Sequence, residues 1–368
     1  MLADLSSVLA ILCVLPVLAY CLLGWSAYAA LSRSIKFATP QAEEVPISIV
    51  IPFRDELENL KRNLPRWTQL LEGNPMAELL LVDDHSSDGG MEWLASIVCP
   101  ERMRILSSSG VGKSAATDHG AKESRHDLLA FTDADCVPHT GWPKGASGHF
   151  RSGEVRMVLA PVVYSRDKGQ FNGLFTLDFL ALMAATEAAV RMGRPVMANG
   201  ANMLIRKKDY LSLVAELDPS DRRVGEDVFL LHALWARWGK GSVVFDDRPE
   251  ARVHTSAPGN IRQFFFQMVR WGGIAKRYKD PAAAGLSLLV FLSNFSLIFS
   301  LFAFPLGWLL WPAKVATDGL LLRKVAIKYE RRDAYRWFLP QSVVYPFYTV
   351  LIGVLSLVLS PLWKRRAV

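Results

Sequence analysis

Three long apolar segments enclose a stretch of mixed polar and apolar composition. They cover residues 5–31, 285–322 and 341–363. The first is long enough to cross a bilayer, which needs about 20 apolar residues. Between them, short apolar runs alternate with longer amphipathic stretches, which is the pattern of strands followed by helices. The chain is therefore predicted to hold an α/β block between membrane-embedded ends.

Within the α/β block, apolar strands run directly into polar clusters. The runs 47–52, 78–82 and 128–131 are predicted strands, and each is followed by several acidic residues. Strands separated by helical stretches are typical of a parallel, doubly wound sheet, whose ligands bind at the carboxyl ends of the strands. We therefore expect the three clusters to meet at one edge of a mostly parallel sheet.

The third cluster contains an Asp-x-Asp triplet, Asp133 and Asp135. Residues i and i+2 of an extended segment point to the same side, so both carboxylates can reach one point. Mg²⁺ and Mn²⁺ prefer oxygen ligands and often share them with substrate phosphates. The triplet thus predicts a divalent-cation site beside a diphosphate, and a solvated turn is the alternative for such a triplet alone.

Charge supports a membrane partner. The chain has 42 Lys and Arg against 35 Asp and Glu, a net charge of +7, and the basic residues cluster beside the apolar segments. This placement favours an anionic membrane surface over nucleic acid. The four cysteines show no metal-ligand spacing and are predicted to be free thiols.

The first apolar segment is predicted to be an uncleaved anchor. A cleaved signal peptide would carry a basic region before the apolar run, whereas the only charge there is Asp4. Arg33 and Lys36 follow the segment, so the positive-inside rule places the α/β block in the cytoplasm. A single span over 285–323 would leave the following basic residues outside. A hairpin broken near Pro305 returns them to the cytoplasm, so both readings stay open with the hairpin preferred.

The stretch from 261 to 279 is predicted to be one basic amphipathic helix. Phe264, Met268 and Trp271 form an apolar stripe, which is the pattern of a helix in the membrane interface. The expected organisation of the chain is an anchor at 5–31, a cytoplasmic catalytic domain at 45–257, the interface helix at 258–281, a transmembrane hairpin or single span at 285–323, a basic cytoplasmic loop at 324–339, and a transmembrane or re-entrant segment at 340–363.

Five motifs in this order resemble the membrane-anchored family 2 glycosyltransferases, which have the GT-A fold. They are Pro52-Phe53-Arg54-Asp55-Glu56, Asp83-Asp84-His85, Asp133-Ala134-Asp135, Gly225-Glu226-Asp227 and Gln267-Met268-Val269-Arg270-Trp271. The resemblance covers about residues 47–272. His85 stands where glycine is usual in the family, and Gly225 replaces a common threonine. Neither change removes a charged group, so both bear on substrate identity more than on activity.

The resemblance implies a nucleotide-sugar pocket at the carboxyl edge of the sheet. The residues that it assigns to donor binding are Pro52, Arg54, Asp55, Glu56, Asp83, Asp84, Lys113, Asp133, Asn199 and Gly200. Lys113 is expected near the diphosphate, and Asn199 with Gly200 near the sugar. The alternatives from residue type alone are loop capping for the aspartates, a solvated lysine at 113, and a plain hairpin turn around 200.

The resemblance also implies the reacting groups. Asp133 and Asp135 would carry the metal, and Glu226 with Asp227 would supply the base. The remaining residues of this kind, expected to close the acceptor side, are Gln267, Arg270 and Trp271. Asp227 precedes an apolar helical run that begins at residue 228, so N-capping is its alternative role. Membrane-interface anchoring is the alternative for the arginine and the tryptophan.

The sequence therefore predicts an inverting glycosyltransferase that depends on a divalent cation, Mg²⁺ or Mn²⁺. It would move a hexose from a nucleotide sugar, a UDP-sugar by preference, to a lipid or lipid-linked acceptor at the cytoplasmic face of the cell membrane. A processive polysaccharide synthase acting on a glycan acceptor is one alternative. A membrane-bound nucleotidyltransferase and an inactive scaffold are the others.

Overall fold

A computed structural model describes residues 2–33, 45–166, 169–302, 306–359, 362–363 and 366–367. Lys36, the break near Pro305 and parts of the C-terminal segment lie outside these residues. The chain divides into two compact units. The sheet unit comprises Ile35–Ser165 and Gly193–Ser256, and the helical unit comprises Met1–Ser34, Arg166–Met192 and Ala257–Val368.

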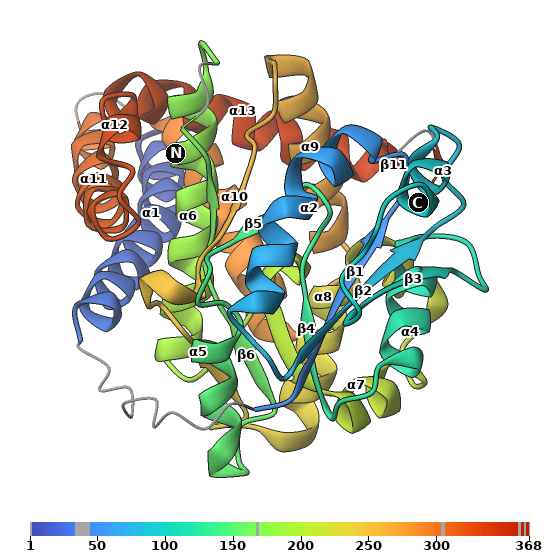
Figure 1. The fold of residues 1–368 in the computed structure, drawn as a ribbon. Helices are drawn as coiled ribbons and strands as arrows, with labels where there is room; N and C mark the ends of the chain where they lie inside the picture. Colours follow the sequence, from blue (N-terminus) through green and yellow to red (C-terminus); the bar gives the residue numbers. More distant parts are fainter. Residues whose placement is uncertain are drawn as a thin grey trace. The chain divides into compact units, whose positions relative to one another are not determined.

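The sheet unit contains a seven-stranded sheet in the order β3-β2-β1-β4-β8-β6-β9. Several of its strands are labelled in Figure 1. Its strands are β1 (Ile47–Phe53), β2 (Ala77–Asp83), β3 (Met103–Ser107), β4 (Leu128–Phe131), β6 (Met157–Leu159), β8 (Met203–Arg206) and β9 (Val243–Phe245). Only β8 runs antiparallel to its neighbours. The prediction of a mostly parallel sheet is confirmed.

Other elements of the sheet unit connect and cover these strands. The helices are α2 (Leu57–Glu72), α3 (Gly90–Ala95), α4 (Lys113–Glu123), α5 (Lys144–Ser147), α7 (Lys207–Val214) and α8 (Pro219–Trp238), with short 3-10 turns η1 (Gly148–Ser152), η2 (Gly200–Asn202) and η3 (Pro249–Ala251). A second sheet has the order β5 (Val137–Pro138), β10 (Val253–Thr255), β7 (Val162–Tyr164). Strands β1 and β2 are buried along their whole length and form the centre of the core.

The parallel register aligns the carboxyl ends of the three predicted strands. Phe53 of β1 pairs with Asp83 of β2, and Val50 pairs with Phe131 of β4. The loops that follow these strands therefore leave the sheet at the same edge, as predicted from the alternation of strands and helices.

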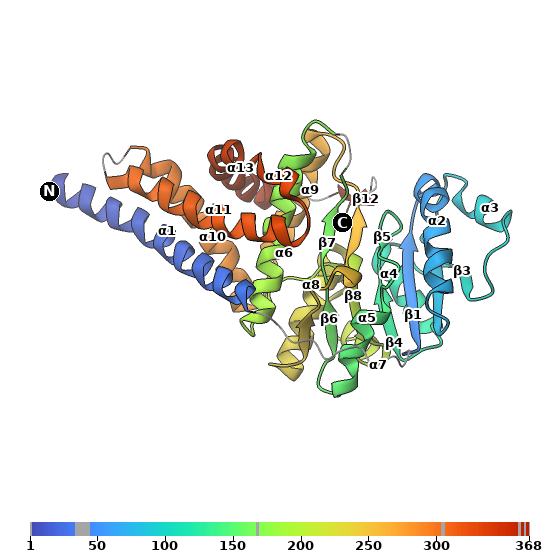
Figure 2. The same ribbon diagram turned by 60° about the vertical axis from the view of Figure 1, so that its left-hand side comes forward.

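The helical unit contains α1 (Leu2–Ser32), α6 (Asn172–Arg191), α9 (Ile261–Ala275), α10 (Pro281–Ser300), η4 (Leu306–Leu309), α11 (Leu310–Lys328), α12 (Arg332–Tyr335) and α13 (Phe338–Val358), followed by the short pair β11 (Leu362–Trp363) and β12 (Arg366–Ala367). Helices α1, α10 and α11 lie side by side in Figure 2. The segment expected as a hairpin or single span forms two helices. The predicted helix 261–279 ends earlier, at Ala275.

Four helices of the described chain are long and apolar enough to cross a membrane: α1 from Cys13, α6, α10 and α13. Helix α6 does not cross one, because its two flanks belong to the same sheet. Strand β4 precedes α6, strand β8 follows it, and the two pair over four residues. One passage through the membrane would put these paired strands on opposite sides. Three apolar helices therefore remain as candidates for spanning.

The polar contacts of α6 agree with a position inside the protein. Glu187 is fully buried. It accepts a hydrogen bond from the Tyr329 hydroxyl at 2.7 Å and forms an ion pair with Arg191 at 2.6 Å. Buried carboxylates need such partners. Asp178 is also buried and accepts a hydrogen bond from Tyr348 of α13. Helix α6 is thus a core helix of the helical unit.

The apolar stripe predicted on α9 packs within the protein. Phe264 stacks on Phe175 of α6 with ring centroids 4.4 Å apart, and Trp271 stacks on Phe179 at 5.9 Å. Two other apolar side chains of α9, Ile261 and Phe266, stay exposed. The rings of Phe264 and Trp271 thus pack on α6, and the position of α9 in a membrane interface stays a prediction.

Candidate active site

The loops after β1 and β2 are joined through the carboxylate of Asp55. Its Oδ1 accepts a hydrogen bond from the Ser87 amide at 2.7 Å, while its own amide donates to Ser86 Oγ at 3.0 Å. The Ser87 amide lowers the pKa of Asp55 and so keeps this carboxylate ionised. An ionised acceptor, held at the edge of the sheet, suits the hydroxyl and N–H donors of a nucleoside.

The second loop holds a buried carboxylate. Asp84 is 1% exposed and accepts a hydrogen bond from the Gly112 amide at 2.7 Å, which links the loop to the start of α4. Asp83 accepts from the Ser86 amide at 3.0 Å, the loop-capping contact considered from residue type. Arg54 Nη1 lies 3.9 Å from Asp84 Oδ2. The two strand-end loops and the start of α4 are therefore fixed to one another by carboxylates.

The remaining residues of the first loop lie beside these contacts. Pro52 is buried within β1, and Glu56 accepts a hydrogen bond from Asn59 in the first turn of α2. Asp55 has a φ of +50° and His85 a φ of +57°. A left-handed backbone explains why glycine is usual at position 85. It is strained for most other residues, although histidine and aspartate adopt it more readily.

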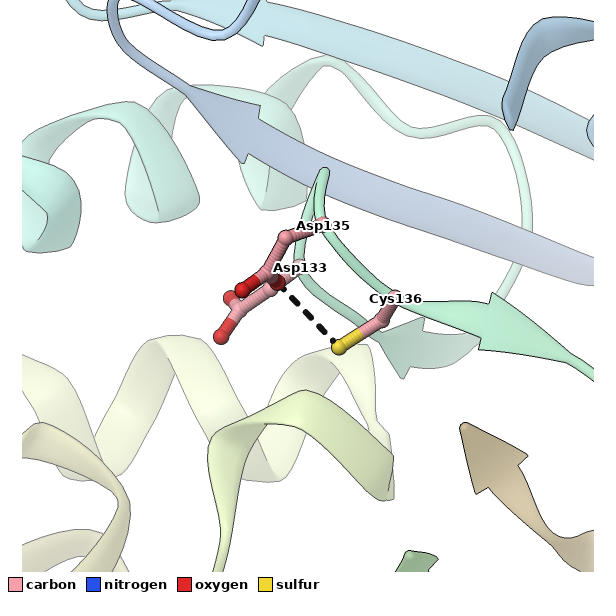
Figure 3. A group of neighbouring side chains, drawn as sticks. All are labelled: Asp133, Asp135 and Cys136. Atoms are coloured by element: carbon pink, nitrogen blue, oxygen red, sulfur yellow. Dashed lines mark hydrogen bonds between the residues drawn. The ribbon is translucent and has the colours of Figure 1, made fainter. Parts of the chain in front are cut away.

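The Asp-x-Asp carboxylates lie together just past β4 (Figure 3). One ligand atom from each of Asp133, Asp135 and Cys136 lies within 4.8 Å of the other two. The Cys136 thiol donates to Asp135 Oδ1 at 3.3 Å. Burial, together with the neighbouring Asp133 carboxylate, raises the pKa of Asp135. A divalent cation would relieve this repulsion, so the paired oxygens fit a hard cation.

Lys113, the first residue of α4, reaches these carboxylates. Its ammonium donates a hydrogen bond to Asp133 Oδ1. Burial would lower the pKa of Lys113, but the attraction of Asp133, with smaller contributions from Asp227 and Asp135, raises it overall. The Lys113 side chain is 41% exposed, but its ammonium is paired with the carboxylate cluster and is not a free surface charge.

Asp227 faces the turn that contains the predicted sugar-pocket residues. Its Oδ2 accepts a hydrogen bond from the Gly200 amide at 2.7 Å, and its Oδ1 accepts from the Val228 amide at 2.9 Å. The Asn199 side chain accepts from the Ala201 amide and caps η2. Burial raises the pKa of Asp227, against the Gly200 amide and Lys113. The arrangement gives a half-buried carboxylate close to Lys113.

The helix around Asp227 differs from the prediction. Helix α8 begins at Pro219, capped by Asp218, and does not start at residue 228. It is interrupted at Gly225, where φ is −160° and ψ is 53°. This φ is extended and open to any residue, so the backbone does not require glycine where the family commonly has threonine. A second helical stretch begins after this interruption, so Asp227 lies near its amino end, as predicted. The capping alternative holds only in part, because the carboxylate accepts from the next amide, of Val228, and also from the Gly200 amide of a separate turn.

Glu226 has different partners from its neighbour. Its Oε1 lies 2.7 Å from the Tyr210 hydroxyl and 3.3 Å from Arg222 Nη2. Gln267, Arg270 and Trp271 lie on α9 in the helical unit, while the other predicted site residues belong to the sheet unit. The contacts of the Ser87 and Gly112 amides were not predicted, because amide donors leave no side-chain signature in the sequence. Sequence reasoning also missed Cys136, because cysteine spacing was compared only with other cysteines.

Comparison with known proteins shows similarity to glycosyltransferases. The glycosyl transferase family 2 model matches residues 48–212. Glycosyltransferase AglE of Haloferax volcanii is 33% identical over 98 residues, which are 26% of this chain and 32% of AglE. Human polypeptide N-acetylgalactosaminyltransferase 15 is 28% identical over 128 residues, 34% of this chain and 20% of that enzyme. The chain thus matches less than a third of the length of either relative.

The fold has a solved counterpart. The mannosyltransferase PcManGT from Pyrobaculum calidifontis, solved with GDP-Man and Mn²⁺, superimposes with a TM-score of 0.58 at 15% identity. The match covers 95% of this chain and 99% of that one. At this identity the likeness concerns the fold alone. Residues 48–212 thus match the glycosyl transferase family 2 model, and the mostly parallel sheet belongs to a fold shared with PcManGT.

Proposed function

We propose that this chain transfers a hexose from a nucleotide sugar to a lipid or lipid-linked acceptor, by an inverting reaction that needs a divalent cation. The observation that carries the proposal is the grouping of Lys113 with two kinds of carboxylate. Asp133 and Asp135 form a pair suited to a cation, and Asp227 is held separately by the Gly200 amide. Lys113 and a cation on the Asp133 and Asp135 pair would bind a diphosphate, and Asp227 would deprotonate an acceptor hydroxyl.

The nucleoside would lie over the loops held by Asp55 and Asp84. We propose a UDP-sugar as donor, from the resemblance of the motifs to the family. The structurally similar PcManGT was solved with GDP-Man, so a guanine nucleotide is the alternative for this site. Carboxylates serve either base, because both uracil and guanine present N–H donors.

The reaction would be a direct displacement. When bound, the divalent cation supplies positive charge against the leaving diphosphate. Lys113 would contact the same phosphates, and Arg270 would add a bidentate guanidinium from α9. Asp227 would take the proton of the acceptor hydroxyl as that oxygen attacks the anomeric carbon opposite the diphosphate. A single attack of this kind inverts the anomeric configuration.

The apolar helices support a membrane acceptor. Helices α1, α10 and α13 remain as candidates for spanning, and three spans are few for a polysaccharide channel. We therefore favour a lipid or lipid-linked acceptor over a growing glycan. Arg33, next to the end of α1, supports a cytoplasmic position of the catalytic domain by the positive-inside rule.

A donor screen tests the proposal. Membranes containing the chain would be incubated with radiolabelled UDP-hexoses and GDP-mannose, then extracted into organic and aqueous phases, with the Asp135→Asn chain as control. We expect label in the organic phase and release of nucleoside diphosphate. Label in an aqueous polymer would favour the processive synthase, and release of pyrophosphate would favour a nucleotidyltransferase. No transfer above the control from any donor would contradict the proposal.

A further inference from the structure

Four side chains of the sheet unit form a closed ring of polar contacts. The Tyr210 hydroxyl lies 2.8 Å from Asp118 Oδ1 and 2.7 Å from Glu226 Oε1. Arg222 Nη2 lies 2.6 Å from Asp118 Oδ1 and 3.3 Å from Glu226 Oε1. Asp118 is on α4, Tyr210 on α7, and the other two on α8. The ring therefore ties three helices together.

The ring engages Glu226 rather than leaving it free to react. Its Oε1 is shared by a phenol and a guanidinium, and the ring of Tyr210 is completely buried. The Glu226 side chain is 15% exposed, and a largely buried carboxylate bound to a charged donor is costly to separate from it. Glu226 is thus held in place, whereas Asp227 turns to the Gly200 amide. The two adjacent acids have separate tasks.

The ring also borders the interruption of α8. Arg222 lies three residues before Gly225, and Glu226 lies directly after it. The carbonyl oxygen of Arg222 accepts a hydrogen bond from Ser114 Oγ at 2.8 Å, and Ser114 is the second residue of α4. The chain is therefore fixed on both sides of the interruption, against the helix whose first residue is Lys113.

We propose that Asp118, Tyr210 and Arg222 are positioning residues, which anchor Glu226 and thereby set the place of Asp227 relative to Gly200 and Lys113. The expected effect of these residues on sugar transfer rests on the proposed function. The placement of Asp227 does not, and it can be measured separately. A displacement of about 1 Å at a reacting group can cost on the order of 100-fold in rate.

The Gly200 amide offers a readout that does not depend on activity. It donates to Asp227 Oδ2 at 2.7 Å, so its hydrogen exchange reports whether that carboxylate stays in place. Tyr210→Phe removes the hydroxyl and keeps the ring, and Asp118→Asn keeps the size of the side chain. Glu216→Gln is the matched control, because Glu216 pairs with Arg237 at the other end of α8.

The experiment combines hydrogen exchange with kinetics on the purified full-length chain. In Tyr210→Phe and Asp118→Asn, we expect exchange at Gly200 to accelerate about tenfold, turnover to fall roughly 10- to 100-fold, and KM for the donor to stay within about threefold. Asp227→Ala serves as the positive control for exchange, and Glu216→Gln should match the parent. Because two different residues are substituted, the test still decides if one of the two variants does not fold.

The outcomes separate this inference from the proposed function. Unchanged exchange at Gly200 in both variants would overturn the positioning role, whatever happens to turnover. Faster exchange in both, with the control unaffected, would support it. A parent chain that transfers no sugar from any nucleotide would refute the proposed function, and the exchange measurement would still decide whether the ring places Asp227.

Discussion

The ammonium group of Lys113 donates a hydrogen bond to the carboxylate of Asp133. Lys113 begins α4 and Asp133 follows β4, so the contact joins two loops at the carboxyl edge of the sheet. The lysine thereby neutralises part of a cluster of acids. A divalent cation would compete with it for Asp133, whereas a diphosphate would attract both.

The first prediction follows from this competition. In Lys113→Met, we expect Mn²⁺ to bind more tightly than to the parent when no nucleotide is present, and nucleoside diphosphate to bind more weakly. Each change should be about tenfold, or about 1.4 kcal/mol. Titration of free Mn²⁺ by electron paramagnetic resonance, with and without UDP, measures both. Lys122→Met, in the last turn of the same helix, is the control. Parallel changes in both affinities would contradict the competition.

The second prediction concerns the cation. Asp135→Asn should abolish transfer, because an amide replaces a charged oxygen ligand, and EDTA should do the same to the parent. Added Mn²⁺ or Mg²⁺ should restore only the parent. Asp127→Asn is a matched control, since Asp127 is exposed and precedes β4 whereas Asp135 follows it. Full transfer in EDTA would rule out a cation requirement.

The strands that end in the site were predictable because most of their residues are apolar. Strands β1, β2 and β4 are completely buried, and burial on both faces favours a nearly continuous apolar sequence. The polar exceptions, Ser48 and Glu78, are hydrogen-bonded to each other. Strand β3, by contrast, is half-exposed and carries a mixed sequence that the pattern does not distinguish from a loop. The antiparallel pairing of β8 is a tertiary contact that no local pattern predicts.

The acidic residues of the site could be predicted from the sequence, but the backbone amides that hydrogen-bond them could not. Asp55, Asp84 and Asp227 are held by the amides of Ser87, Gly112 and Gly200, and any residue could supply such a donor. Asp218 and Pro219, a usual cap and a usual first-turn residue, mark the start of α8 in the sequence. The helix was nevertheless predicted to start at 228, because the continuous apolar run begins there. The interruption at Gly225 is flanked by contacts with α4 and α7, which no local pattern predicts.

The third prediction uses a carboxylate away from the site. Asp246 is completely buried and accepts hydrogen bonds from Arg248 Nη2 at 2.6 Å and His149 Nε2 at 3.2 Å. Burial alone would raise its pKa, but these bonds lower it to about 2. Because the folded-state pKa lies below the unfolded value of about 3.9, the carboxylate stabilises the fold above pH 4 and loses that effect as pH falls towards 2.

Asp246→Asn should therefore lower the free energy of unfolding by about 2 kcal/mol at neutral pH. The difference from the parent should shrink between about pH 4 and pH 2. Thermal unfolding of the purified chain across this range measures both, with Glu250→Gln, an exposed acid of the same loop, as control. A difference that is independent of pH would show that packing, not charge, explains the loss.

The fourth prediction concerns topology. Single cysteines at Ser152 and Ala215, both exposed and on opposite sides of α6 in sequence, should be labelled from the same side of the membrane. The positive-inside rule predicts that side to be cytoplasmic. An impermeant maleimide applied to intact cells, in a chain with Cys99 replaced by serine, should react only after permeabilisation. Labelling of one site alone in intact cells would mean that α6 spans the membrane after all.

The last prediction separates catalysis from structure at Asp227. Its carboxylate accepts hydrogen bonds from the Gly200 and Val228 amides, and the oxygen of an asparagine amide could keep one of them. If the group has only this structural role, Asp227→Asn should cost little transfer. If it is the general base, the substitution removes the proton acceptor, and such losses are typically 10²- to 10⁴-fold in turnover.

Donor affinity decides between a lost base and a damaged pocket. The proposed nucleotide contacts lie at Asp55, Asp84 and the metal carboxylates, so Asp227→Asn should bind the nucleotide about as well as the parent does. Calorimetry with UDP or GDP, beside transfer rates at saturating donor, provides the comparison. Retained affinity with turnover reduced at least 100-fold supports the base. Retained turnover would remove Asp227 from the reaction, and loss of both would show that it holds the pocket together.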